Sequence, residues 1–164
     1  MGKISQKTRV LMVCVGNICR SPIAEAVMDE VIIRAGLQKE WHVESAAIEG
    51  WHSGCIPDER ALRVLAKHNI SYIGYARVLT TEDFMKFDYI FGMDRSNLAA
   101  LKRMAPHNAT AKVLLLGNFG LKPDDRVIED PYYTVGEAPF ENIYQKCHIA
   151  CQNFLEQARQ QQIL

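Results

Sequence analysis

The sequence predicts a single α/β domain of three layers, in which a parallel sheet of about four strands is flanked by helices. Short apolar runs typical of strands alternate along the chain with stretches of helical periodicity. The last of these runs, residues 112–116, is continuously aliphatic, as expected of a parallel strand covered on both faces. A length of 164 residues fits one core, so residues 1–164 are predicted to form a single domain.

The first third of the chain is expected to hold two strands and a helix. The apolar run at residues 8–13 predicts the first strand, and Ser21 and Pro22 are favourable opening residues for the helix that follows it. Apolar positions then recur with helical spacing until Gly36, which suits a left-handed stop. The alternating segment at residues 41–47 predicts the second strand.

The middle of the chain begins with a loop at residues 48–57, which is rich in glycine, and a helix at residues 58–68. Residues 80–83 resemble a capping box for a short helical turn. The apolar, aromatic run at residues 89–93 predicts the third strand.

The last third is expected to contain a helix at residues 97–104, the strand at residues 112–116, a long loop at residues 117–138 and a closing helix at residues 140–159. Ligands in parallel sheets bind at the carboxyl ends of the strands. We therefore expect the loops that follow the strands to share one edge of the sheet and one site.

A reactive thiol is predicted at the end of the first strand. Cys14 is followed by a glycine-containing loop and, six positions later, by Arg20 at the start of a helix. Backbone N–H groups at a helix start bind anions and favour a thiolate over a thiol. The planar fork of Arg20 can hold two oxygens of one anion. An isolated pair of this spacing would more often be a buried cysteine and a surface charge, but strand, loop and helix start coincide here and predict a phosphate loop.

Composition limits the other possibilities. Nineteen basic residues balance nineteen acidic ones, so no overall field favours nucleic acid or an anionic membrane. No apolar run reaches the length of a membrane span, and the first residues lack the core of a signal peptide. The five cysteines form neither a paired framework nor a metal-binding spacing. We therefore expect a cytoplasmic protein without metal or cofactor.

Two motifs carry a resemblance to a known family. Residues 13–26, Val-Cys-Val-Gly-Asn-Ile-Cys-Arg-Ser-Pro-Ile-Ala-Glu-Ala, and Glu-Asp-Pro-Tyr-Tyr at residues 129–133 resemble the low-molecular-weight protein tyrosine phosphatases. The similarity runs through nearly the whole chain and includes residues 44–47, 87–90 and 93–94. Larger tyrosine phosphatases carry the Cys-x5-Arg motif late in the domain, so the order of the motifs separates the two families.

The resemblance implies a role for each motif residue. Cys14 would be the nucleophile that forms a cysteinyl phosphate, Arg20 the phosphate clamp, and Asp130 the general acid and then the general base. Ser21 would stabilise the Cys14 thiolate, and Asn17 would hold the loop in a strained shape. The predicted phosphate-binding residues are Val15, Gly16, Asn17, Ile18, Cys19, Arg20 and Ser21.

The resemblance also places the pocket and shows one departure. Trp51, Tyr132 and Tyr133 are candidate pocket walls, because a phenyl phosphate needs flat apolar surfaces around it. Exposed aromatic residues could instead only cap the core, and Tyr133 could be a kinase target. Gly74 stands where relatives often carry a histidine that supports the phosphate loop, so that support is in question here.

The predicted function is hydrolysis of phosphotyrosine proteins or small aryl phosphates, with phosphate as a product inhibitor. A thiol redox enzyme such as an arsenate reductase is disfavoured because residues 87–97 contain no cysteine. A catalytically dead phosphate-binding module would be expected to lack Cys14, Arg20 or Asp130. Phosphoarginine, on which some bacterial relatives act, stays open. Cys19 either packs the loop or serves as a redox partner that forms a disulfide with oxidised Cys14.

Overall fold

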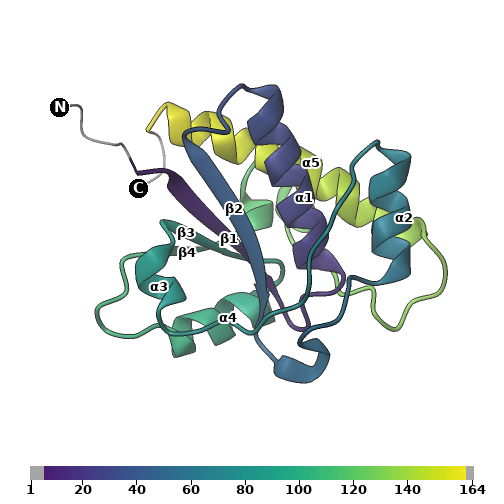
Figure 1. The fold of residues 1–164 in the computed structure, drawn as a ribbon, viewed down its shortest axis with the longest axis horizontal. Helices are drawn as coiled ribbons and strands as arrows, with labels where there is room; N and C mark the ends of the chain where they lie inside the picture. The colour runs from purple at the N-terminus through teal and green to yellow at the C-terminus, as the bar shows by residue number, and fades with distance from the viewer. Residues whose placement is uncertain (1–5, 162–164) are drawn as a thin grey trace.

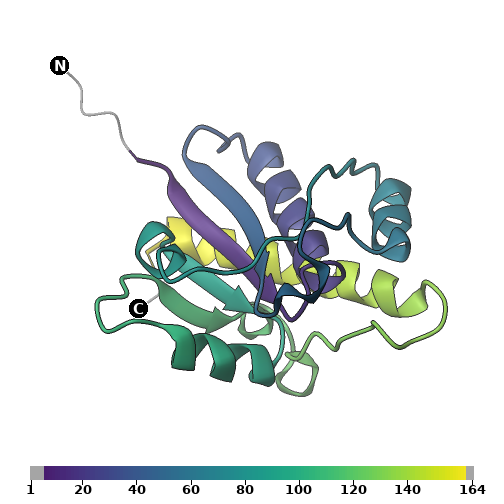
Figure 2. The ribbon, with the colours of Figure 1, turned by 60° about the horizontal axis from the view of Figure 1, so that its bottom comes forward.

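The structure, a computed structural model, describes residues 6–161. Within these residues, four parallel strands form one sheet in the order β2-β1-β3-β4. Cys14 lies opposite Ala47, and Val13 lies opposite Gly92, so the carboxyl ends of the strands meet at one edge, where the loops gather in Figure 2. The strands are β1 Thr8–Cys14, β2 Trp41–Ala47, β3 Tyr89–Gly92 and β4 Lys112–Leu115.

Helices cover both faces of the sheet. Figure 1 shows α1 and α5 on one side of the strands and α4 on the other. Alternation along β1 matches these layers: Val10 and Met12 pack into the core under α1, α2 and α5, while Leu11 and Val13 pack toward α3 and α4. The predicted three-layer α/β fold is confirmed. The α-helices of the described residues are α1 Arg20–Arg34, α2 Glu59–Lys67, α3 Asp83–Lys86, α4 Arg95–Met104 and α5 Ala138–Arg159.

The predicted start of the first helix is wrong. The helix α1 begins at Arg20 with Cys19 as its N-cap, and no side chain caps it. Ser21 lies inside the first turn, and its hydroxyl contacts the preceding loop, 3.0 Å from Cys14 Sγ and 2.8 Å from Asn17 Nδ2. The Ser21 hydroxyl oxygen, which was expected to cap the helix, therefore bonds to the loop instead. The predicted left-handed stop is confirmed, since Gly36 has a φ of 72°.

The helix after β3 begins earlier than predicted, at Arg95, because Asp94 caps it. Asp94 Oδ1 accepts the Asn97 N–H at 2.7 Å, and Asn97 Oδ1 accepts the Asp94 N–H at 3.2 Å, which is a reciprocal capping box. This cap fixes Asp94 directly beyond the carboxyl end of β3.

The loops after the strands contain short 3₁₀ turns at Gly50–His52, Leu116–Asn118 and Pro123–Asp125. Among residues 6–161, no helix combines the length and apolar character that crossing a membrane requires. The closing helix α5 buries an apolar stripe of Ile143, Cys147, Ala150, Cys151, Phe154 and Leu155.

Candidate active site

The loop between β1 and α1 is anchored through its carbonyl groups. The carbonyl oxygens of Cys14 and Val15 accept the N–H groups of Ile48 and Glu49 at 3.0 and 2.9 Å, and Ile18 O accepts a third backbone N–H at 2.7 Å. Over the described chain, the N–H groups of residues 15–19 donate to no protein acceptor. The loop is therefore held from outside, and its N–H groups are available for an anion.

Asn17 sets the bend of this loop. Its φ is 57°, a left-handed conformation that asparagine tolerates better than most residues. Its Nδ2 donates to Ser21 Oγ at 2.8 Å and to Ser45 Oγ at 2.9 Å. Its Oδ1 accepts the Arg77 N–H at 3.1 Å. The buried amide thus ties the loop to α1, to β2 and to the segment that runs beside β2.

Cys14 lies at the bottom of a cavity of about 250 Å³ at the carboxyl edge of the sheet. The thiol is 3% exposed, and its Sγ is 3.0 Å from Ser21 Oγ. The thiol of Cys19, on the same loop, belongs to the core, and burial together with Asp58 raises its pKa. The residues that line the cavity are Cys14, Val15, Gly16, Ile18, Cys19, Arg20, Trp51, His52, Asp130, Tyr132 and Tyr133.

Arg20 is almost completely buried, with 1% of its surface exposed, and hydrogen bonds hold its guanidinium group in place. Its Nη1 donates to Asp94 Oδ2 at 2.6 Å and to the Ile128 carbonyl at 2.9 Å. Burial alone would lower the Arg20 pKa, but Cys14 and the carboxylates of Asp94 and Asp130 raise it, so the guanidinium stays charged. Its buried Nε has no partner among the described residues, and its Nη2 lies 3.6 Å from Asp130 Oδ2. The Nε and Nη2 edge can therefore bind two oxygens of one anion.

Asp130 reaches the cavity from a segment far from the loop in sequence. Its side chain is 45% exposed, and its Oδ1 accepts the Tyr132 N–H at 3.1 Å. The neighbouring Glu129 is exposed and does not line the cavity. Of these two adjacent carboxyl groups, Asp130 is the one placed to exchange a proton with a group bound over Cys14.

Aromatic side chains surround the mouth of the cavity. Trp51 is 72% exposed, and the rings of Tyr132 and Tyr133 meet edge to face with centroids 4.8 Å apart. His52 packs between the loop and Tyr132, whose ring centroid is 5.6 Å away. A Cβ on Gly16 would lie 2.8 Å from His52 Cδ2, so this close approach requires glycine. All three predicted wall residues therefore line the cavity, and His52 joins them.

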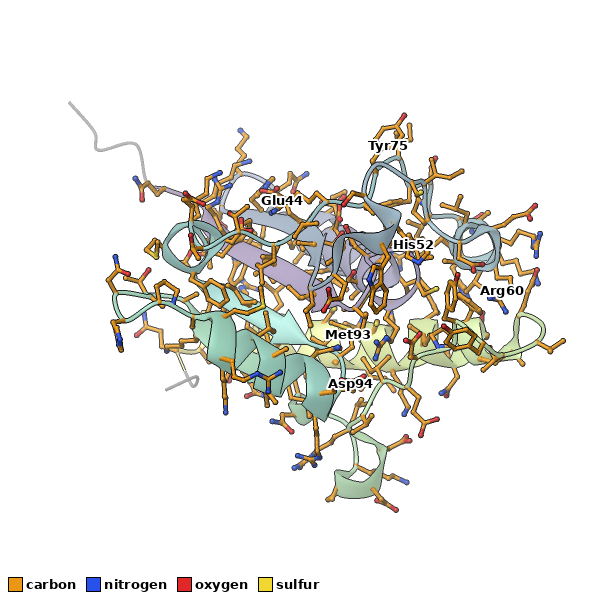
Figure 3. All side chains as sticks on the ribbon, turned by 90° about the horizontal axis from the view of Figure 1, so that it is seen from below. Glu44, His52, Arg60, Tyr75, Met93 and Asp94 are labelled. Carbon is orange, nitrogen blue, oxygen red and sulfur yellow. The ribbon has the colours of Figure 1, made fainter. Side chains whose placement is uncertain are left out.

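Two residues of the site escaped sequence reasoning. Asp94 follows β3 directly, and its place at the end of a parallel strand was the signal that could have found it. His52 carries no such signal beyond its neighbour Trp51. His52 lines the cavity and Asp94 reaches it through its hydrogen bond to Arg20, and Figure 3 labels the two residues on different loops. Across residues 6–161, no group of three metal-ligating side chains is placed to hold a metal ion.

Comparison with known proteins points to one family. A model of the family described as low molecular weight phosphotyrosine protein phosphatase matches residues 9–163. The chain is 73% identical over 164 residues to low molecular weight phosphotyrosine protein phosphatase 2 of Drosophila melanogaster, a match that covers 100% of both sequences.

Solved structures agree with the sequence match. A crystal structure of a protein tyrosine phosphatase from Entamoeba histolytica has a TM-score of 0.91 at 32% identity and covers 96% of this chain and 100% of its own. The crystal structure of DARP, a Drosophila arginine phosphatase, has a TM-score of 0.88 at 37% identity, with coverage of 92% and 97%. The chain therefore belongs to the low molecular weight phosphotyrosine protein phosphatase family, a family of phosphoric monoester hydrolases.

Proposed function

We propose that this protein hydrolyses phosphotyrosine in proteins, and small aryl phosphates, through a cysteinyl-phosphate intermediate. The observation that supports this most directly is that Cys14, Arg20 and Asp130 line one cavity although Asp130 comes from a distant loop. A nucleophile, a cation and a carboxyl group at one phosphate-sized site are the groups that this chemistry needs.

In the first step, the Cys14 thiolate attacks phosphorus in line with the leaving phenol oxygen. The S–P bond forms as the P–O bond breaks, and protonated Asp130 gives its proton to the departing oxygen. Arg20, through Nε and Nη2, and the free N–H groups of the loop stabilise the charge on the other phosphate oxygens. The Ser21 hydroxyl, 3.0 Å from Cys14 Sγ, stabilises the thiolate before attack and after release.

In the second step, a water molecule attacks the phosphocysteine. Asp130, now a carboxylate, takes a proton from the water as its oxygen bonds to phosphorus and the S–P bond breaks. The thiolate is restored and inorganic phosphate leaves. Because phosphate fits the same loop, it inhibits as a product. The cycle needs no metal or cofactor, since Arg20 and the loop N–H groups supply the positive potential.

The aromatic mouth supports an aryl substrate. Trp51 and Tyr132 offer flat apolar faces above a nucleophile that lies at the cavity floor, so a phosphate on a phenyl ring reaches it while the ring is covered. Phosphoarginine is the second candidate, because DARP is an arginine phosphatase with 37% identity to this chain. Free cysteines along the described chain support a cytoplasmic location, where a reducing pool keeps the nucleophile as a thiol.

One set of initial rates tests this proposal. We expect the parent protein to hydrolyse p-nitrophenyl phosphate and a phosphotyrosine peptide much faster than a phosphoserine peptide, and to leave arsenate unreduced. Cys14→Ser should abolish turnover while the folded variant still binds phosphate. A higher kcat/KM on a phosphoarginine peptide than on the phosphotyrosine peptide would make phosphoarginine the substrate. Full activity of Cys14→Ser would show that Cys14 is not the nucleophile.

A further inference from the structure

A partly buried carboxyl group between α1 and β2 receives two hydroxyl donors on one oxygen. Glu25 Oε1 is 2.5 Å from Ser45 Oγ and 2.9 Å from the Tyr72 hydroxyl. Burial and the neighbouring carboxylate raise the pKa of Tyr72, so its phenol keeps its proton and donates it. Since both hydroxyls approach the same oxygen, Ser45 also spends its only proton on Glu25.

This fixes the direction of the hydrogen bonds that lead to the nucleophile. With its proton directed to the carboxyl group, Ser45 Oγ can only accept from Asn17 Nδ2, at 2.9 Å. The second proton of that amide nitrogen goes to Ser21 Oγ at 2.8 Å. Ser21 Oγ already accepts, and its own proton is left to point at Cys14 Sγ, 3.0 Å away. A donor toward sulfur favours the thiolate.

The position of Tyr72, at the far end of this series of hydrogen bonds, depends on a glycine. A Cβ on Gly74 would lie 2.6 Å from the Tyr72 hydroxyl oxygen and 2.9 Å from its Cζ. Carbon atoms do not approach an oxygen and a ring carbon so closely, so any larger residue at this position would move the phenol away from Glu25. Gly74 therefore has a steric role here, although its φ is not in the left-handed region.

We propose that Tyr72 and Glu25 are positioning residues for the nucleophile, which orient the Ser45–Asn17–Ser21 hydrogen bonds toward Cys14, and that Gly74 is the residue that admits Tyr72 to this place. The proposal rests on the proposed function for its kinetic consequences, but its effect on the Cys14 thiol does not depend on any substrate. The support of the phosphate loop that was in question at Gly74 is thus assigned to the Tyr72 phenol.

The test compares Tyr72→Phe, Gly74→Ala and the double variant with the parent. Tyr75→Phe is the matched control, because Tyr75 is 68% exposed and points away from the body of the molecule in Figure 3. The first measurement is the pH dependence of Cys14 alkylation by iodoacetamide. It is followed on the Cys14 peptide by mass spectrometry, because the exposed Cys55 would react as well. The second is kcat/KM for p-nitrophenyl phosphate, and circular dichroism checks that each variant is folded.

In Tyr72→Phe and in Gly74→Ala, we expect the midpoint of alkylation to move to higher pH and kcat/KM to fall about fivefold, the effect of one net hydrogen bond. The double variant should be no worse than either single variant, because both changes remove the same contact. Tyr75→Phe should match the parent. A parental alkylation profile in folded Tyr72→Phe overturns the role of Tyr72, and additive losses in the double variant overturn the role of Gly74. If the parent protein had no phosphatase activity, the proposed function would be refuted. The alkylation profiles would still decide whether Tyr72 and Gly74 position the nucleophile.

Discussion

Asp94 holds Arg20 and caps a helix with the same carboxylate. Its Oδ2 lies 2.6 Å from Arg20 Nη1, while its Oδ1 accepts the Asn97 N–H at 2.7 Å. The first contact orients the guanidinium so that its other edge faces the cavity, and the second fixes the start of α4. The geometry of the phosphate clamp is therefore set by the end of β3 and the beginning of α4.

The two contacts of Asp94 can be separated by mutation. Asp94→Asn keeps a good N-cap but loses the charge beside Arg20, so we expect phosphate to inhibit about thirtyfold more weakly, from a charged hydrogen bond of about 2 kcal/mol. Asp94→Ala should in addition lose about 1 kcal/mol in the free energy of unfolding, the usual worth of a cap. Inhibition constants and urea unfolding measure the two effects. Asp124→Asn, at an exposed position, is the control. Unchanged phosphate inhibition in Asp94→Asn would contradict the orienting role.

Asp130 should matter most for poor leaving groups. In Asp130→Ala we expect kcat for a phosphotyrosine peptide to fall by about 10² or more, the usual range of general acid catalysis. The loss should be much smaller for aryl phosphates whose phenols leave without a proton. Steady-state rates on a series of phenols of increasing acidity provide the measurement. Glu129→Ala is the neighbouring carboxylate outside the cavity and should behave like the parent. Equal losses along the series would assign the proton to another group.

Glu25 should make stability depend on pH. Burial raises the pKa of its carboxyl group, the hydroxyls of Ser45 and Tyr72 oppose this, and the neighbouring Glu44 and Asp29 add to the rise. The folded state thus favours the neutral acid. The resulting contribution to the free energy of unfolding is present below the ordinary Glu pKa and is lost as pH rises through the raised pKa of the folded state.

Glu25→Gln keeps an oxygen for both hydroxyls but cannot ionise. We therefore expect the difference between its Tm and the Tm of the parent to increase from pH 4 to pH 7. Thermal unfolding across this range, with the exposed Glu40→Gln as the reference, provides the measurement. A Tm difference that stays constant over these pH values would show that burial of Glu25 has no net effect on its titration.

Trp51 should affect substrate choice without affecting stability. Its side chain is 72% exposed, so Trp51→Ala removes little buried area and should leave the Tm within a degree or two of the parent, about 0.5 kcal/mol. The preference for a phosphotyrosine peptide over a phosphoserine peptide should narrow, because the phenyl ring loses one face of its pocket. Competition between the two peptides measures this ratio. Tyr75→Ala, an exposed aromatic position outside the cavity, is the control. An unchanged ratio would show that Trp51 does not contact the phenyl ring of the substrate.

Mild peroxide is expected to inactivate the protein reversibly. The Cys14 thiolate would be oxidised to a sulfenic acid, and the Cys19 thiol would then displace water to form a disulfide. Cys19 lines the cavity although it is only 4% exposed, so the two cysteines share one loop and one cavity. Bound phosphate should protect, and dithiothreitol should restore activity. Cys19→Ser should stay active but lose this recovery, whereas Cys55→Ser, outside the cavity, should recover. Full recovery of Cys19→Ser would leave Cys19 with a packing role alone.

The sequence predicted those parts of the molecule that are encoded locally. Cys14 and Arg20 lie on one loop, and their setting between a strand and a helix is visible in a few residues. Asp130 could not be found by spacing, because it meets Arg20 only after the chain has crossed the sheet several times, and a family resemblance was needed to name it. The misplaced helix start at Ser21 has a similar cause, since tertiary partners on Cys14 and Asn17 outweigh the local preference for a cap.

The Asn17 amide has a consequence for the kinetics of association. Both of its hydrogens and its carbonyl oxygen are bonded to Ser21, Ser45 and Arg77, so the left-handed turn is locked before any ligand arrives. The entropy of ordering the loop is lost when the chain folds and is not lost again in each catalytic cycle. An oxyanion therefore meets a receptor that is already in its bound shape, and its rate of capture should approach the limit set by diffusion through the aromatic mouth.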